Sequence, residues 1–104
     1  MHSNSHVGIS LAAMVHLGAA APHLTYALDT HYPWQEDEVI AGGKMKFEDG
    51  AVTVSKEPGL GVSLDRHELA RLHENYNRCG LTHRDDEIEM QKVEPEWRFE
   101  AVRW

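Results

Sequence analysis

The longest apolar stretch of the chain covers residues 9–21, and its Ala, Leu and Met residues favour an α-helix. Pro22 follows directly and ends that helix. The stretch is apolar almost all round, which is typical of a helix buried on several sides. Because a chain of 104 residues holds little else that could cover it, we infer that this helix packs against further structure. It is too short to span a membrane, which takes roughly 20 apolar residues.

Shorter patterns indicate β-structure. Residues 24–28, Leu-Thr-Tyr-Ala-Leu, alternate in the way that a strand does. Residues 44–47 and 51–54 flank the dipeptide Asp49-Gly50, which is typical of a tight hairpin. The acidic and then glycine-rich residues 35–43 predict a loop. A helix followed at once by a strand is typical of the αβ units of a parallel sheet or barrel.

A second helix is predicted to begin near Asp65. Asp65 is its expected N-cap, and Glu68 lies three residues further on, as in a capping box. Gly80 ends the helix. The apolar side chains along it form one stripe, made of Leu69, Leu72, Tyr76 and Cys79. The tail of residues 81–104 shows no clear periodicity. The element order predicts the end of an α/β unit followed by a small α+β cap.

Charge and cysteine content narrow the function classes. The net charge of -7 and the pI of about 5.5 argue against binding to nucleic acid, whose phosphates require Lys and Arg. The same charge argues against an anionic membrane surface. Cys79 is the single cysteine, so no intrachain disulfide can form and a cytoplasmic location fits best.

The polar residues His2-Ser3-Asn4-Ser5-His6 precede the first helix. Side chains and free N–H groups at such a helix start can face an anion. Alternatively, Ser or Asn serves only as the N-cap. His2 and His6 are spaced i, i+4, but two histidines without a nearby carboxylate or thiol make a weak metal signal.

Two further positions carry candidate chemistry. His31 follows the predicted strand, where barrel enzymes place active-site residues. The alternative is a loop histidine packed against Trp34. Arg84 in Arg84-Asp85-Asp86 either belongs to a solvated charge cluster or holds a carboxylate through two parallel hydrogen bonds. No complete catalytic set is visible, so the residues alone predict only part of an α/β protein.

Several of these stretches resemble, in order and spacing, the C-terminal end of the glucarate dehydratase family, in the mandelate racemase branch of the enolase superfamily. The resemblance covers almost the whole chain. It rests on His2-Ser-Asn-Ser-His6, Ile9-Ser-Leu-Ala12, Ala19-Ala-Ala-Pro22, Asp29-Thr-His31, Trp34-Gln-Glu36, Pro58-Gly-Leu-Gly-Val62, Gly80-Leu81 and Arg84-Asp-Asp86.

The resemblance implies the C-terminal part of a modified (β/α) TIM-type barrel with an α+β capping domain. Residues 1–34 would form the end of the barrel, with its last helix and strand. Residues 35–104 would return into the capping domain as hairpin, helix and tail. The chain would then be a C-terminal fragment of a longer enzyme and inactive by itself.

The family reaction removes the proton beside a carboxylate of glucarate or idarate, and a β-hydroxyl leaves as water to give a keto-deoxy sugar diacid. The resemblance implies that His2 is an acid/base group that also contacts substrate. Ser3, Asn4, His31 and Arg84 would bind substrate.

The same resemblance implies that a Mg²⁺ ion stabilises the enolate in the full-length parent. The ligands of this ion and the family's catalytic lysine would both lie outside this chain. The parent would be a homo-oligomer. Other acid-sugar dehydratases or racemases of the superfamily, and a non-catalytic remnant, are the alternatives.

Overall fold

The computed structural model describes residues 6–83 and 85–101. In chain order these hold the α-helix α1 (Gly8–Ala20), the 3₁₀ helix η1 (Tyr32–Trp34) and the α-helices α2 (Arg66–Cys79) and α3 (Asp86–Gln91). The chain divides into two compact units, residues 1–73 and 74–104. In the described part of the chain, no helix is long and apolar enough to cross a bilayer.

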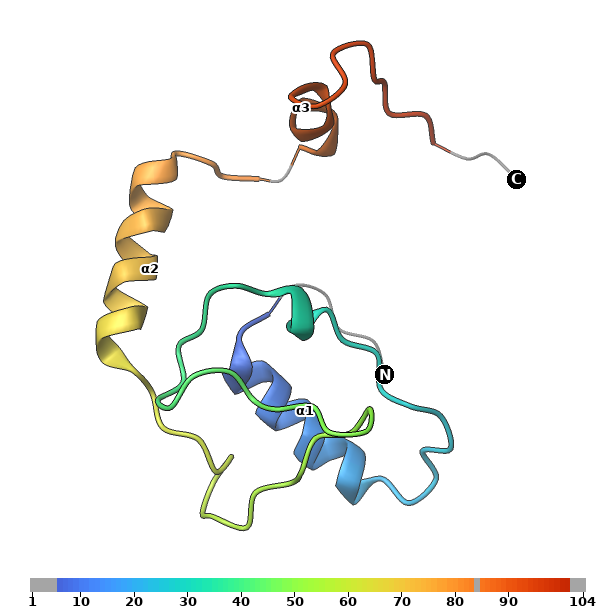
Figure 1. The fold of residues 1–104 in the computed structure, drawn as a ribbon, viewed down its shortest axis with the longest axis vertical. Helices are drawn as coiled ribbons and strands as arrows, with labels where there is room; N and C mark the ends of the chain where they lie inside the picture. The colour runs from blue at the N-terminus through green and yellow to red at the C-terminus, as the bar shows by residue number, and fades with distance from the viewer. Residues whose placement is uncertain (1–5, 84, 102–104) are drawn as a thin grey trace. The chain divides into compact units, whose positions relative to one another are not determined.

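The first helix is confirmed, and it carries the core of the first unit. Leu11 and Met14 of α1 form a buried cluster with Tyr32 of η1. Figure 1 shows the loops of residues 22–64 winding around α1. They do not cover it fully, because Leu17 remains 54% exposed. An evenly apolar helix therefore keeps part of its apolar surface open.

The strand predicted over residues 24–28 is not formed, and this prediction is wrong for the described chain. A strand needs a neighbouring strand to satisfy its backbone donors and acceptors. Over the residues it describes, the structure forms no such neighbour and no strand longer than an isolated bridge. The expected last barrel strand is therefore not seen as a strand here.

The predicted hairpin turn is confirmed. Glu48 and Ala51 exchange both backbone hydrogen bonds, at 3.0 and 2.9 Å. Between them Asp49 has φ 50° and Gly50 has φ 76°. Two consecutive positive φ angles match a type I′ turn, which is why Asp-Gly is favoured there. The pairing ends at this one bridge, so the predicted strands over residues 44–47 and 51–54 are not formed, and that part of the hairpin prediction is wrong.

The second helix begins where it was predicted. The Asp65 carboxylate accepts hydrogen bonds from the N–H groups of His67 and Glu68, at 2.9 and 3.0 Å. The reciprocal half of a capping box is absent, because the Asp65 N–H donates to the carbonyl of Val39 at 2.7 Å. The Glu68 carboxylate pairs with Arg71 instead. The start of α2 is thus bonded to a distant loop.

The apolar stripe of α2 is largely exposed, with only Leu72 partly covered by other described residues. No residue of α2 is buried, and Tyr76 is 65% exposed. Gly80, with φ 66°, ends the helix as predicted.

The last helix, α3, was not predicted. It is only six residues long, too short to show a helical period. Its local signal is Asp85, the N-cap residue, whose carboxylate accepts the N–H of Ile88 at 3.1 Å. Asp85 thus caps α3, and in the sequence it directly follows the predicted site residue Arg84.

Candidate functional site

Of the predicted site residues, His31 is the one that the structure places. His2, Ser3, Asn4 and Arg84 lie outside the described residues. His31 is half-buried directly before η1. Its ring lies edge-on to the ring of Trp34, with centroids 5.5 Å apart. The predicted packing against Trp34 is confirmed, and the substrate-binding role of His31 stays a prediction.

Two of the motifs meet at the N-terminal end of α1. His6, the last residue of His-Ser-Asn-Ser-His, lies 2.8 Å from the Thr30 hydroxyl through its Nε2 atom. Thr30 is the middle residue of Asp-Thr-His, and its hydroxyl also accepts the N–H of Tyr32 at 3.2 Å. The His6 ring stands edge-on to the Tyr32 ring at 6.1 Å. Residues 24 positions apart in the sequence are therefore held together.

A buried carboxylate occupies the N-terminus of α1. The N–H of Gly8 donates to both carboxylate oxygens of Glu38, at 3.0 and 3.2 Å. The N–H groups of Val39 and Ile40 donate to Oε1 at 2.6 and 3.1 Å. The Tyr32 hydroxyl donates to Oε2. The positive end of a helix dipole favours a carboxylate at this place.

This arrangement corrects the N-capping interpretation of residues 2–6. The N-cap position of α1 is held by Val7, which has no capping side chain. Hence neither Asn4 nor a serine of that stretch is the N-cap residue. Among the described residues, the anion at this helix start is the carboxylate of Glu38. That residues 2–5 also face an anion stays a prediction.

Burial and hydrogen bonding shift the pKa values of this pair in opposite directions. Burial raises the pKa of Glu38, but the hydrogen bonds from Tyr32 and from three backbone N–H groups outweigh it, so the pKa is lowered from 4.5. Burial and the bond to Glu38 raise the pKa of Tyr32 to about 12. The pair therefore consists of an ionised carboxylate and a neutral phenol at ordinary pH.

The described residues do not fit a Mg²⁺ site. Within residues 6–83 and 85–101, no three side chains of His, Cys, Asp or Glu come together in a group that could hold a metal ion. Mg²⁺ prefers carboxylate oxygens and water as ligands.

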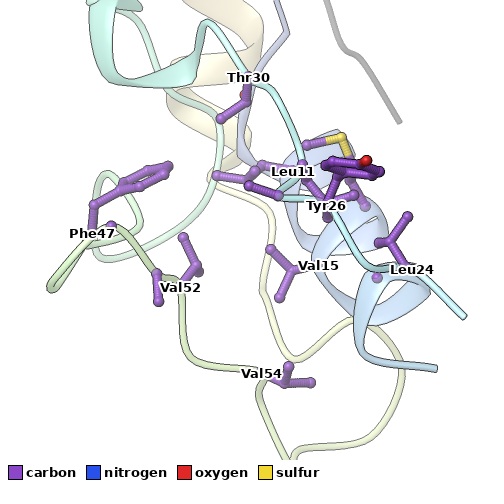
Figure 2. Close-up of a pocket in the computed structure, with 14 residues that line it drawn as sticks. Leu11, Val15, Leu24, Tyr26, Thr30, Phe47, Val52 and Val54 are labelled. Atoms are coloured by element: carbon purple, nitrogen blue, oxygen red, sulfur yellow. The ribbon is translucent and has the colours of Figure 1, made fainter. Parts of the chain in front are cut away.

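An apolar cavity of about 290 Å³ lies beside α1. Figure 2 shows Leu11 and Val15 of α1 between Leu24 and Tyr26 on one side and Val52 and Val54 on the other. A polyhydroxylated diacid needs several convergent polar groups, whereas Tyr26 and Thr30 are the only described lining residues with a hydroxyl group. This cavity is therefore suited mainly to apolar packing. Thr30, which lines it, also contacts His6, and that polar contact is the better candidate site.

Sequence reasoning missed the buried pair of Glu38 and Tyr32. Glu38 lies within residues 35–43, whose acidic and then glycine-rich composition predicts a loop. One available signal was the apolar pair Val39-Ile40 next to it, which is buried. Another was Gly8, a glycine at the start of a helix, which indicates a close approach by another group.

Comparison with known proteins gives concordant results. Residues 1–68 match the family described as enolase C-terminal domain-like. The probable glucarate dehydratase of Streptomyces coelicolor is 49% identical over 107 aligned residues, which cover the whole chain and 25% of that protein. An enolase from Mycobacterium smegmatis complexed with tartrate is 56% identical with a TM-score of 0.86, covering 100% of this chain and 25% of its own.

A second solved structure is an enolase from Pseudomonas fluorescens with bound magnesium, potassium and tartrate. It is 55% identical with a TM-score of 0.85, over 94% of this chain and 23% of its own. The chain thus spans about a quarter of the length of the curated relative it matches. Identity above one half together with this backbone agreement shows common descent and a common fold. The chain belongs to the enolase C-terminal domain-like family.

Proposed function

We propose that this chain supplies part of the substrate-binding and acid/base machinery of a sugar-acid dehydratase of the glucarate type. The observation that carries the proposal is the 2.8 Å contact between His6 and Thr30. It joins the His-Ser-Asn-Ser-His stretch to the Asp-Thr-His stretch, the two stretches in which four of the five proposed site residues lie. Such convergence of polar motifs from distant parts of a chain is typical of an active site.

The ligands of similar proteins support the substrate class. The enolase from Mycobacterium smegmatis holds tartrate, as does the one from Pseudomonas fluorescens. Tartrate is a small hydroxy diacid, the chemical class to which glucarate and idarate belong. On this proposal Arg84 pairs with one carboxylate of the diacid, as a guanidinium does best. Ser3, Asn4 and His31 hydrogen-bond the rest of the substrate.

In the proposed reaction His2 takes the proton from the carbon beside a carboxylate. The electrons of that C–H bond form a C=C bond, and the hydroxyl of the next carbon accepts the proton from the protonated His2 and leaves as water. The resulting enol converts to the keto acid, so the net change is the loss of one water. Histidine suits the task because its ordinary pKa lies near neutral pH.

The proposal extends to the whole protein. Residues 1–34 complete a TIM-type barrel, and residues 35–104 return to its capping domain. Mg²⁺ is bound by residues outside this segment, in keeping with the magnesium in the Pseudomonas fluorescens structure. The whole protein is a homo-oligomer in the cytoplasm.

A chimera tests this proposal. The C-terminal quarter of the Streptomyces coelicolor relative is replaced by the 104 residues of this chain, because the alignment covers the chain from end to end. The purified chimera is incubated with Mg²⁺ and with glucarate, idarate or tartrate in turn, and keto-acid release is followed. We expect turnover with at least one sugar diacid.

The 104-residue chain alone and the relative without its C-terminal quarter serve as controls, and both are expected to be inactive. A folded chimera that binds Mg²⁺ but releases no keto acid from any of the three diacids would count against the proposal. Turnover with tartrate alone would replace glucarate by the smaller diacid as the proposed substrate.

A further inference from the structure

We propose that Glu38, together with Tyr32, is a positioning residue that fixes the start of α1 against the loop of residues 29–34. This inference rests on the proposed function, since the groups that it positions are His31 and the stretch ending at His6. In the described structure the hydrogen-bond partners of Glu38 are the Tyr32 hydroxyl and the backbone N–H groups of Gly8, Val39 and Ile40, so its proposed action runs through the segments that carry these groups.

Glu38 contacts the start of α1 directly. Both carboxylate oxygens accept the N–H of Gly8, which is two residues after His6. A methyl group added to Gly8 would lie 2.6 Å from Oε2. This glycine therefore lets the carboxylate approach the helix closely, and the approach sets where α1 begins.

Hydrogen bonds through Tyr32 connect Glu38 to the loop of residues 29–34. The Tyr32 hydroxyl donates to Oε2 of Glu38, and its oxygen accepts the N–H of Met45 at 3.0 Å. The backbone N–H of the same tyrosine donates to Thr30, whose hydroxyl contacts His6. The contacts thus form a closed circuit from His6 through Thr30, Tyr32 and Glu38 to Gly8.

The chemical nature of a carboxylate matters at position 38. A buried charge costs desolvation energy, and an apolar side chain of similar size would often fill the space at lower cost. An apolar side chain, however, cannot accept hydrogen bonds from Gly8, Tyr32, Val39 and Ile40 at once. The carboxylate therefore holds three segments of the chain in fixed positions: the helix start at Gly8, the loop at Tyr32 and residues 38–40.

The chimera described above allows a direct test with matched variants. Glu38→Gln keeps the size and removes the charge, while Tyr32→Phe keeps the ring and removes the hydroxyl. The controls are Glu57→Gln, at an exposed position, and Tyr26→Phe, where the side chain is 86% exposed. Two readouts are taken: steady-state kinetics well below the unfolding temperature, and amide hydrogen exchange of residues 8–12.

We expect Glu38→Gln to lower kcat about 10- to 100-fold with a smaller change in KM, because a misplaced acid/base group slows the chemical step. Exchange in the first turn of α1 should become faster. Tyr32→Phe should act in the same direction, and both controls should stay within about twofold of the parent, as surface changes usually do. Combining Glu38→Gln with Thr30→Val should give a non-additive loss, because both belong to one network.

The outcomes separate this inference from the proposed function. If the unmodified chimera shows no turnover, the proposed function fails, and exchange alone decides whether Glu38 holds the helix start. Equal exchange in Glu38→Gln and Glu57→Gln overturns the inference in either case. Faster exchange with kcat unchanged shows a purely structural carboxylate and also overturns it. If Glu38→Gln does not fold, Tyr32→Phe supplies the same comparison.

Discussion

The carboxylate of Glu38 lies so close to the Cα of Gly8 that a methyl group there would be 2.6 Å from Oε2 and 2.8 Å from Cδ1 of Ile40. Alanine has the higher helix propensity, by about 1 kcal/mol in a helix interior. At Gly8 this gain is outweighed, because the carboxylate is held by several donors and cannot move aside without losing them. Overpacking of this kind costs about 1–3 kcal/mol.

We therefore expect Gly8→Ala to lower the free energy of unfolding of the chimera. Gly18→Ala is the matched control in the same helix. Its added methyl would meet Cδ1 of Leu28 at 2.6 Å, the free end of a flexible side chain. Urea denaturation of both variants compares the two sites. Equal stability of the two variants would show that Glu38 moves aside as easily as Leu28.

The lowered pKa of Glu38 predicts a loss of stability in acid. The unfolded chain takes up this proton near the ordinary pKa of 4.5, and the folded chain takes it up only at lower pH. The stabilisation is therefore complete above pH 4.5 and is lost as the pH falls through the folded pKa. The stability difference between the chimera and its Glu38→Gln variant should shrink below pH 4.5. A difference that is independent of pH in acid would contradict this.

The raised pKa of Tyr32 predicts a loss of stability in base. The unfolded tyrosine loses its proton near pH 10.0 and the folded one near pH 12. Because the folded state holds the proton longer, stability falls as the pH rises above 10.0. Tyr32→Phe removes this dependence, so its stability relative to the chimera should improve above pH 10.0. Tyr26→Phe, measured in parallel, should show no such trend.

Local signals in the sequence were enough to predict two helices and one turn. Pro22 ends the first helix, Asp65 caps the second, and Asp49-Gly50 makes the hairpin turn. Each of these signals acts within four residues, so no knowledge of the rest of the fold is needed.

The parts that could not be predicted depend on partners far away in the chain. The apolar alternation of residues 24–28 is real, but a strand also needs a neighbour to pair with. Glu38 looks like any acidic loop residue until Gly8, 30 positions earlier, is brought beside it. Of the site, the sequence indicated the motifs ending at His6 and His31. Their meeting through Thr30 and their support by Glu38 required the structure.

The isolated chain should associate in solution. Leu17, Tyr76 and Leu81 are each more than half exposed, and the apolar cavity beside α1 is open to water in the absence of neighbours. Exposed apolar surface of this extent promotes association. Light scattering coupled to size exclusion should show a polydisperse sample that binds a hydrophobic dye, while the chimera should be monodisperse. A sharp monomer peak of the chain with a cooperative thermal transition would refute this prediction.

His2 and Arg84 should differ in their kinetic signatures. In the chimera, His2→Asn should keep substrate binding and lower kcat by about 10² to 10⁴-fold, the usual contribution of general acid–base catalysis. Arg84→Lys keeps the charge and loses the planar fork, so it should mainly raise KM. Steady-state kinetics with both glucarate epimers distinguish the two. Near-normal kcat in His2→Asn would remove the acid/base assignment.

The three residues 38–40 anchor the starts of two helices at once. Gly8 of α1 is bonded to the side chain of Glu38, and Asp65, which caps α2, is bonded to the carbonyl of Val39. The bond from Asp65 to Val39, together with that from the Ala41 N–H to the Ser63 carbonyl, closes the loop of residues 41–64 at its base, whatever its length. Gly42 and Gly43 have open space around them, and doubling a loop adds only about 0.6 kcal/mol of closure entropy. The Gly42-Gly43 turn is therefore a place where evolution or an engineer can insert residues without disturbing either helix.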